Sequence, residues 1–427
     1  MRKLLLLMTT AMALLATGCL KDSLKSSFTY TIATPVLKTA AEVMAGVGNK
    51  PAQKLEVPGK IYVQGNYLFV AEHQRGLHII NNTNPANPVN EAFVEVPGME
   101  DLAVQGNLLY VDCFDDLLVL DINNPKAVKL VSFTEGVFPD RRSLFGYALD
   151  SNMVVVGWNY RDTTIERKID LGDDLIYTNG FFWAENSDAF LFSIRNSVSA
   201  ASAASPVAGK GGSMARFALS HNHLYTVSQS DLRAFSLQQP AQPQLRSITQ
   251  LGWGIETIYP FKGNLFIGSN TGMFIYTLAN PETPQKAGTF EHARVCDPVV
   301  ADDDYAYVTL RSGTNCFGQI NQLNVVDILN IYSPKLVTVL PLTNPHGLDK
   351  DGDYLYVCDG SDGLRVIDAR NPAVLNRLGR YAVKNAYDVI CWNKVAIVSA
   401  ADGIHQFDLK AAPELKKLSY IPAQPYN

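Results

Sequence analysis

A short pattern that recurs eight times constrains this chain more than any other feature. In each copy a turn with Asn or Asp precedes a run of β-branched and aromatic residues, as in GNYLFVA at 65–71 and GDYLYVC at 352–358. The Asn or Asp residues of the eight turns are Asn66, Asn107, Asn152, Asn222, Asn264, Asp304, Asp353 and Asn393. Six of the seven spacings lie between 40 and 49 residues, and the one from Asn152 to Asn222 is 70. A fixed period near 40 predicts repeated supersecondary units.

Each unit contains about four short strands. A second apolar run follows every copy, as in DLLVLD at 116–121 and GLRVID at 363–368, and Asn-Pro often comes next. Pro ends a strand because it cannot donate a hydrogen bond to the ladder. Units of this kind bury their faces only by stacking into a closed ring. We therefore predict an all-β fold, a β-propeller of eight four-stranded blades, or seven if the third unit, which carries the long gap, is degenerate.

Two segments depart from the repeat. Residues 39–46 are predicted to form a short helix, and an insertion is expected at about 159–212. Its first part, 160–185, is charged, whereas 197–212 is rich in Ser, Ala and Gly and predicts a mobile loop. The aromatic residues in or beside the insertion could pack on their own blade or stack on a sugar or a partner protein; they are Trp158, Tyr160, Phe181, Phe182 and Trp183.

The N-terminus has the pattern of a lipoprotein signal peptide. Arg2 and Lys3 precede twelve mainly apolar residues at 4–15, which is shorter than the roughly 20 that span a bilayer. The stretch ends in LATGC at 15–19, similar to a bacterial lipobox except for Ala16. We expect residues 1–18 to be removed, Cys19 to carry lipid, 19–52 to form a tether with the short helix, and 53–427 to form the propeller. Leu20 follows Cys19 in place of the Asp that retains lipoproteins in the inner membrane. We therefore expect the protein to lie in the outer membrane, facing the periplasm or the medium.

The repeats resemble a known family. GLRVID, DLLVLD and GLHII occupy the place of the third-strand consensus of the LVIVD repeat, found in bacterial and archaeal surface β-propellers. The segments GGSMARFAL at 211–219, IETIYP at 255–260 and NPHGL at 344–348 are similar to propeller lipoproteins of Bacteroidota-type bacteria. The resemblance covers residues 28–427 and implies a β-propeller fold and a location at the cell surface. It implies no activity.

One rim of the ring is expected to gather charged side chains. The innermost strand of each blade should be the run before the turn, and counting back five to eight residues gives its entrance end. Those positions are Lys60, Glu100, Asp101, Arg216, Glu256, Asp297, His346 and Asp388. The carboxylates suit Ca²⁺, whereas Lys60 and Arg216 suit an anion. The alternative is that these groups pair with one another in a wet channel.

His346 and the cysteines leave further alternatives open. His346 could act as a general base or metal ligand, or be a hydrogen-bonded residue of its Asn-Pro-His-Gly turn. Cys296 and Cys316 lie twenty residues apart in one unit and could form a disulfide, whereas Cys113 and Cys358 are expected to be buried thiols.

Composition and motifs narrow the function without fixing it. The chain has 36 Lys and Arg against 41 Asp and Glu, and a net charge of −5 argues against a nucleic-acid partner. No metalloprotease, nucleophile-elbow or phosphate-loop motif is present. We predict a non-enzymatic scaffold that binds a glycan, a peptide or an outer-membrane partner protein. The alternatives are a polysaccharide-acting enzyme that uses His346 with Glu256 or Asp297, and a structural accessory of an outer-membrane complex.

Overall fold

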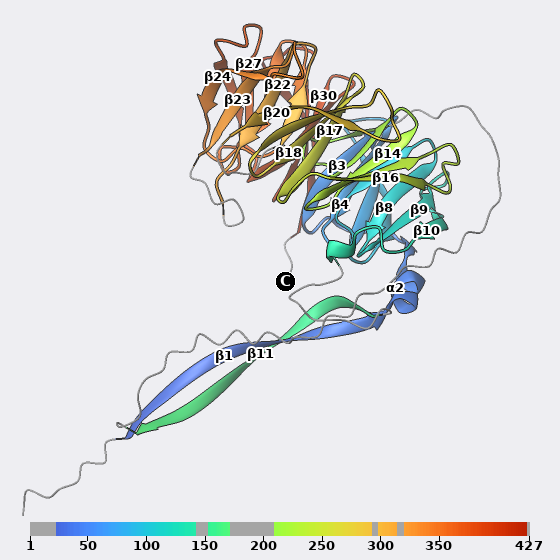
Figure 1. Cartoon of the computed structure of the whole chain (residues 1–427), viewed down its shortest axis with the longest axis vertical. Helices are drawn as coiled ribbons and strands as arrows, with labels where there is room; N and C mark the ends of the chain where they lie inside the picture. Colours follow the sequence, from blue (N-terminus) through green and yellow to red (C-terminus); the bar gives the residue numbers. More distant parts are fainter. Residues whose placement is uncertain (1–22, 142–152, 171–208, 293–297, 314–319, 425–427) are drawn as a thin grey trace, which may run out of the picture. The chain divides into compact units, whose positions relative to one another are not determined.

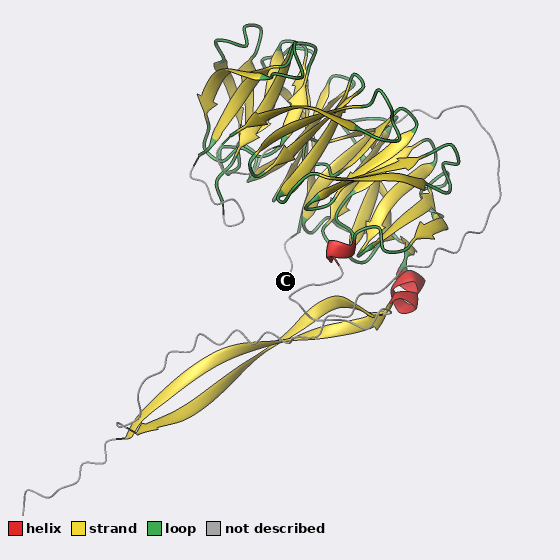
Figure 2. Cartoon of the chain, viewed as in Figure 1, coloured by secondary structure: helices red, strands yellow, loops and turns green. Residues whose placement is uncertain are grey.

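The chain forms two units. The computed structural model describes residues 23–141, 153–170, 209–292, 298–313 and 320–424. One unit comprises residues 1–38 and 155–195, and the other comprises 39–154 and 196–427. The larger unit is built almost entirely of strands (Figure 2). No helix in the described part of the chain is long and apolar enough to cross a membrane.

The larger unit is a seven-bladed β-propeller (Figure 1). Each blade is an antiparallel sheet of four strands in chain order. Blades 1 to 3 are β3 (Pro58–Gln64), β4 (Tyr67–Glu72), β5 (Gly76–Asn81) and β6 (Val89–Glu95); β7 (Leu102–Gln105), β8 (Leu108–Cys113), β9 (Asp116–Asp121) and β10 (Lys129–Thr134); and β13 (Phe217–Ser220), β14 (His223–Val227), β15 (Asp231–Ser236) and β16 (Gln244–Gln250).

The other four blades repeat this plan. They are β17 (Ile255–Phe261), β18 (Asn264–Ser269), β19 (Gly272–Thr277) and β20 (Gln285–Glu291); β21 (Val299–Ala301), β22 (Tyr305–Leu310), β23 (Gln322–Asp327) and β24 (Lys335–Pro341); β25 (Leu348–Asp351), β26 (Tyr354–Cys358), β27 (Leu364–Asp368) and β28 (Asn376–Tyr381); and β29 (Ala386–Trp392), β30 (Val395–Ala400), β31 (Gly403–Asp408) and β32 (Lys416–Pro422). The first strand of each blade contacts the first strand of the next, and β29 contacts β3, so the ring is closed.

The core is a ring of apolar clusters between neighbouring blades. One such cluster joins blades 3 and 4, and another joins blades 6 and 7. Tyrosines add hydrogen bonds across these seams: the Tyr110 hydroxyl donates to the Pro240 carbonyl of the next blade at 2.9 Å, and Tyr225 does the same to Pro281 at 2.8 Å. These two proline-containing turns thus end strands and also accept bonds from the preceding blade.

The third repeat does not form a blade. Its strand, β11 (Met153–Asp170), pairs with β1 (Ser23–Thr39) in a two-stranded ribbon. The Thr31 hydroxyl donates to Asp162 at 2.7 Å across this ribbon. The first apolar residues of β11 correspond to the second strand of a blade. The charged run RDTTIERKID follows them, so the apolar third strand that a blade must bury does not come next. The count is therefore seven, the lower of the two predicted numbers.

The predicted helix at 39–46 is confirmed as α2 (Ala40–Gly46). Thr39 caps it, since its hydroxyl accepts the Glu42 backbone N–H and the Glu42 carboxylate accepts the Thr39 N–H. After it, β2 (Gly48–Lys50) adds to the outer strand β6 of blade 1. A single-turn 3₁₀ helix, η1 (Pro139–Arg141), follows blade 2.

The axis of the ring is filled by residues 209–213, which we name the plug. Within it β12 (Lys210–Gly211) pairs with β3, the innermost strand of blade 1. The Gly209 N–H donates to Val104 of blade 2 at 3.0 Å, and the Ser213 hydroxyl accepts the Leu348 N–H of blade 6 at 2.8 Å. The expectation of a mobile loop over 197–212 is therefore wrong for its last residues, because three blades hold this segment.

Candidate binding face

Four of the predicted rim residues share one level of the ring. Counting back four residues from the end of an inner hairpin strand gives Lys60, Asp101, Arg216, Thr257, Gly347 and Asp388. In blade 5 the same place belongs to Pro298, because its carbonyl accepts the Thr309 N–H as the Arg216 carbonyl accepts the Val227 N–H in blade 3. Glu100, Glu256 and His346 lie one residue earlier, nearer the loops. Asp297 lies outside the described residues. We call the end of the propeller that carries these positions the rim face.

The charges of blades 1 to 3 pair with one another. Lys60 Nζ lies 2.8 Å from Asp101 Oδ2, which also accepts the Arg216 backbone N–H. Both partners of the Lys60–Asp101 pair are largely buried. The expected alternative, that these groups neutralise one another, is therefore found for this part of the rim face.

Glu100 lies between two arginines. Its carboxylate is 3.4 Å from Arg141 and 3.6 Å from Arg216. Burial raises the pKa of Glu100, but Arg141, Arg216 and Lys60 outweigh it, so the net pKa is below its usual value. Arg141 also binds the fully buried Asp112. Sequence reasoning missed Arg141, since it follows an outer strand and reaches the rim face only through η1.

Asp388 differs from the other acidic residues of the rim face. It is fully buried, and only one carboxyl oxygen has a partner, the Val389 N–H at 3.0 Å. Burial raises its pKa well above the ordinary value, with Asp349 adding to the rise. A Cβ on Gly212 of the plug would lie 2.0 Å from Asp388 Oδ2, and one on Gly347 would lie 2.3 Å from Oδ1. Asp388 is thus a packed residue beside the plug, with no exposed surface.

His346 is held by its own turn. Its backbone N–H donates to Cys358 at 2.7 Å, its carbonyl accepts the Thr309 hydroxyl at 2.7 Å, and Nε2 lies 3.3 Å from Asn344 Nδ2. The ring packs against Tyr387, with centroids 5.7 Å apart. Burial and the charge of Arg311 lower its pKa to about 4, so the imidazole is neutral at pH 7.

The remaining ligand predictions have a mixed outcome. Among the described residues no group of three or more His, Cys, Asp or Glu could hold a metal ion. Cys113 and Cys358 are buried free thiols, as expected, and Cys391 is also free. Cys19, Cys296 and Cys316 lie outside the described residues, as do Phe181, Phe182 and Trp183.

One exposed aromatic residue on the rim face was not predicted. Trp253 lies in the loop before β17 and is 71% exposed. The signal that could have found it is the Gly-Trp-Gly sequence at 252–254, placed just before an inner strand.

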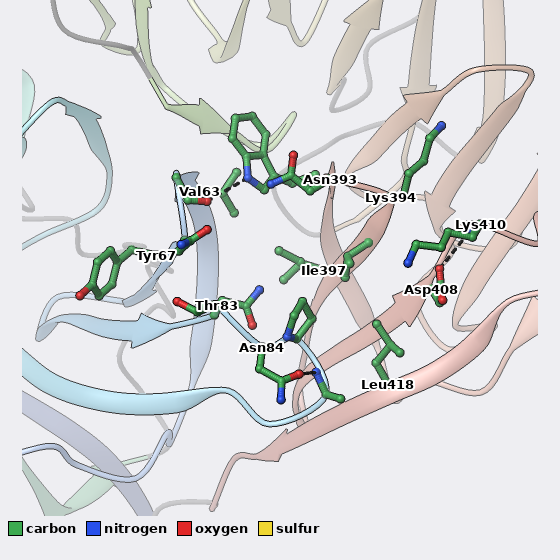
Figure 3. Close-up of a pocket in the computed structure, with 17 residues that line it drawn as sticks. Val63, Tyr67, Thr83, Asn84, Asn393, Lys394, Ile397, Asp408, Lys410 and Leu418 are labelled. Atoms are coloured by element: carbon green, nitrogen blue, oxygen red, sulfur yellow. Dashed lines mark hydrogen bonds between the residues drawn. The ribbon is translucent and has the colours of Figure 1, made fainter.

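A cavity of about 360 Å³ lies at the opposite end of the strands, between blades 1 and 7. Val63 and Ile397 form apolar walls, and Thr83, Asn84 and Lys410 line its mouth (Figure 3). The Trp392 indole N–H donates to the Gly65 carbonyl beside it at 3.1 Å. None of the predicted rim residues lines this cavity, so it is separate from the charged cluster.

Comparisons with known proteins agree with the fold. Three segments, residues 59–93, 99–133 and 350–383, match the LVIVD repeat; they lie in blades 1, 2 and 6. A functionally unknown protein from Desulfotomaculum acetoxidans is 12% identical with a TM-score of 0.53, covering 85% of this chain and 100% of that one. The periplasmic gluconolactonase of Pseudomonas aeruginosa is 11% identical with a TM-score of 0.52, covering 88% and 96%. A search of curated proteins by sequence found no match. Likeness at these identities extends to the fold alone.

Proposed function

We propose that this protein is a lipid-anchored scaffold of the outer membrane that holds a glycan, a peptide or a partner protein on the rim face without chemical turnover. The observation that carries this proposal is the plug. Residues 209–213 bond to the inner strands of three blades at the axis, and charged side chains of blades 1 to 3 pair with one another on the rim face. Enclosed, mainly apolar clefts are typical of small-molecule sites, whereas broad polar surfaces suit larger partners.

The charge arrangement of the rim face supports recognition. Ion pairs such as Lys60–Asp101 and Arg141–Glu100 hold the side chains in fixed positions before a partner arrives. Fixed positions reduce the entropy that binding must overcome. Paired charges of this kind contribute to the choice and orientation of a partner more than to affinity.

The anchor is proposed from the N-terminal sequence. The LATGC segment at 15–19 and the short apolar stretch before it support lipidation at Cys19. The test is to express the Cys19→Ser variant and to fractionate the cells. We expect wild type in the outer-membrane fraction and the variant outside it. A variant that stays in the membrane as fully as wild type would contradict the anchor.

The enzyme alternative rests on His346 with Glu256. A general base works best with a pKa near the working pH, and the pKa of His346 is about 4. This observation favours binding over turnover.

The experiment that separates binding from turnover incubates full-length protein in detergent micelles with outer-membrane extract and with bacterial polysaccharides. Bound material and new reducing ends are both measured. We expect retained material and no cleavage, and Glu256→Gln and His346→Ala should leave retention largely intact. Cleavage that disappears in these two variants would replace the proposal with the enzyme.

A further inference from the structure

Trp253 is the most exposed tryptophan among the described residues. It is 71% exposed, whereas Tyr110, Tyr225, Tyr307 and Tyr356 of the second strands are fully buried. An isolated exposed apolar side chain is ordinary, but a large aromatic ring on a face already rich in paired charges resembles the centre of a binding surface.

The backbone on both sides of Trp253 is shaped to present it. Gly252 and Gly254 have φ values of +96° and +89°, a region that other residues rarely adopt. The Gly254 N–H donates to the Gln229 carbonyl at 2.9 Å, and the Gly254 carbonyl accepts the Asn270 N–H at 2.8 Å. A Cβ on Gly254 would lie 2.3 Å from the Asn270 side chain. The loop is therefore held between blades 3 and 4.

A hydrogen-bond donor lies at the end of the Trp253 loop, and an acidic residue follows that loop in the chain. The Arg216 guanidinium lies 3.4 Å from the Ile255 carbonyl, two residues after Trp253, and Glu256 follows directly. Arg216 is also near Glu100 of blade 2, at 3.6 Å. Donors and acceptors beside an apolar plate match the chemistry of a sugar, which has an apolar C–H face and hydroxyls at its edge.

We propose that Trp253 is a stacking platform for a saccharide ring. This inference rests on the proposed function and names its ligand class. A peptide would be expected to need an apolar pocket or an unpaired strand beside the aromatic residue. The loop that carries Trp253 is instead hydrogen-bonded to blade 3 through Gln229 and to blade 4 through Asn270.

The test uses full-length protein in detergent micelles on an array of immobilised neutral and acidic oligosaccharides. The strongest hit is then measured as a free oligosaccharide by titration calorimetry. The variants are Trp253→Ala and Trp253→Phe. The matched control is Tyr332→Ala, because Tyr332 is 69% exposed on a turn of blade 5 away from the rim face.

We expect Trp253→Ala to weaken binding of the free oligosaccharide about tenfold, Trp253→Phe to retain most of the affinity, and Tyr332→Ala to match wild type. Equal affinity in wild type and Trp253→Ala would overturn the platform. If no saccharide binds but outer-membrane extract yields a protein partner, the saccharide inference fails and the proposed function stands. If neither is retained, both fail.

Discussion

Asp388 lies in the inner strand β29, and Glu100 comes just before the inner strand β7. Their surroundings move their pKa values in opposite directions. Glu100 has two arginines and a lysine near it, which lower its pKa against the effect of burial. Asp388 is buried beside the plug, and burial raises its pKa. Packing therefore sets the direction in which the pKa of each carboxyl moves.

Asp388→Asn should be more stable than wild type at high pH. When the pKa of Asp388 is raised in the folded state, the unfolded chain loses its proton first as pH rises. Wild type therefore loses stability from about pH 4 upwards, until the pH passes the folded pKa. The Asn variant has no proton to lose, so its melting temperature relative to wild type should rise from pH 4 to pH 8.

Scanning calorimetry at four pH values measures this difference. The control is Asp303→Asn, a mostly exposed turn residue, which should follow the wild-type pH curve closely. If the melting temperature of Asp388→Asn relative to wild type falls as pH rises, then Asp388 is ionised in the folded protein.

The spacing of the turns predicted which residues lie near the rim more accurately than it predicted their positions along the inner strands. Lys60, Asp101, Arg216 and Asp388 were found from the turns, and they do share one level. Glu256 and His346 were offset by one residue. For Glu256 the cause is that Asn264 is the first residue of β18, whereas Asn393 is the first turn residue after β29. Asn is accepted both within a turn and at the start of the next strand. The register of the strands therefore follows from their hydrogen-bonded pairing and not from the position of Asn.

At the scale of elements, the sequence pattern misled in two segments. The third repeat has the apolar run that forms the second strand in the seven blades, but this run pairs with β1, because pairing depends on partners far away in the chain. The plug is rich in glycine and serine and therefore resembled a linker. Its order comes from contacts with three blades, which no local propensity encodes.

Gly212→Ala should destabilise the propeller. The added methyl would lie 2.0 Å from the buried Asp388 carboxyl, so the plug or β29 must shift. Overpacking of this kind costs about 1–3 kcal/mol. Differential scanning fluorimetry should show a lower melting temperature. Gly46→Ala is the control, since nothing lies within 4 Å of its added methyl. Equal melting temperatures for Gly212→Ala and wild type would mean that the plug does not occupy the axis.

At the scale of the whole molecule, the ring closes without a strand shared between the first and last blades. Blade 7 is built from four consecutive strands, and an apolar cluster joins it to blade 1. Asn82 and Gln406 add two reciprocal hydrogen bonds of 2.9 and 2.8 Å across this seam. Leu55 forms a parallel bridge with Ala423. The repeat predicted a ring, but its closing contacts involve residues that differ from blade to blade.

A double-mutant cycle should detect this closure. Asn82→Ala and Gln406→Ala each leave the other amide without its partner, at a cost of about 1–2 kcal/mol. The double variant should cost less than the sum, with a coupling of about 1 kcal/mol in the free energy of unfolding. Urea denaturation measures all four proteins. Strict additivity would mean that these two side chains do not meet.

We propose that recognition takes place on the rim face. To test this, a photo-reactive residue is placed at Gln229, in the rim loop beside Trp253, in living cells. In a second variant it is placed at Thr83, which lines the cavity at the opposite end of the propeller. Adducts on the protein are measured by mass after irradiation. If recognition takes place on the rim face, we expect adducts with the bound partner from Gln229 and none from Thr83. Adducts from Thr83 alone would contradict it and place the partner at the other end of the propeller.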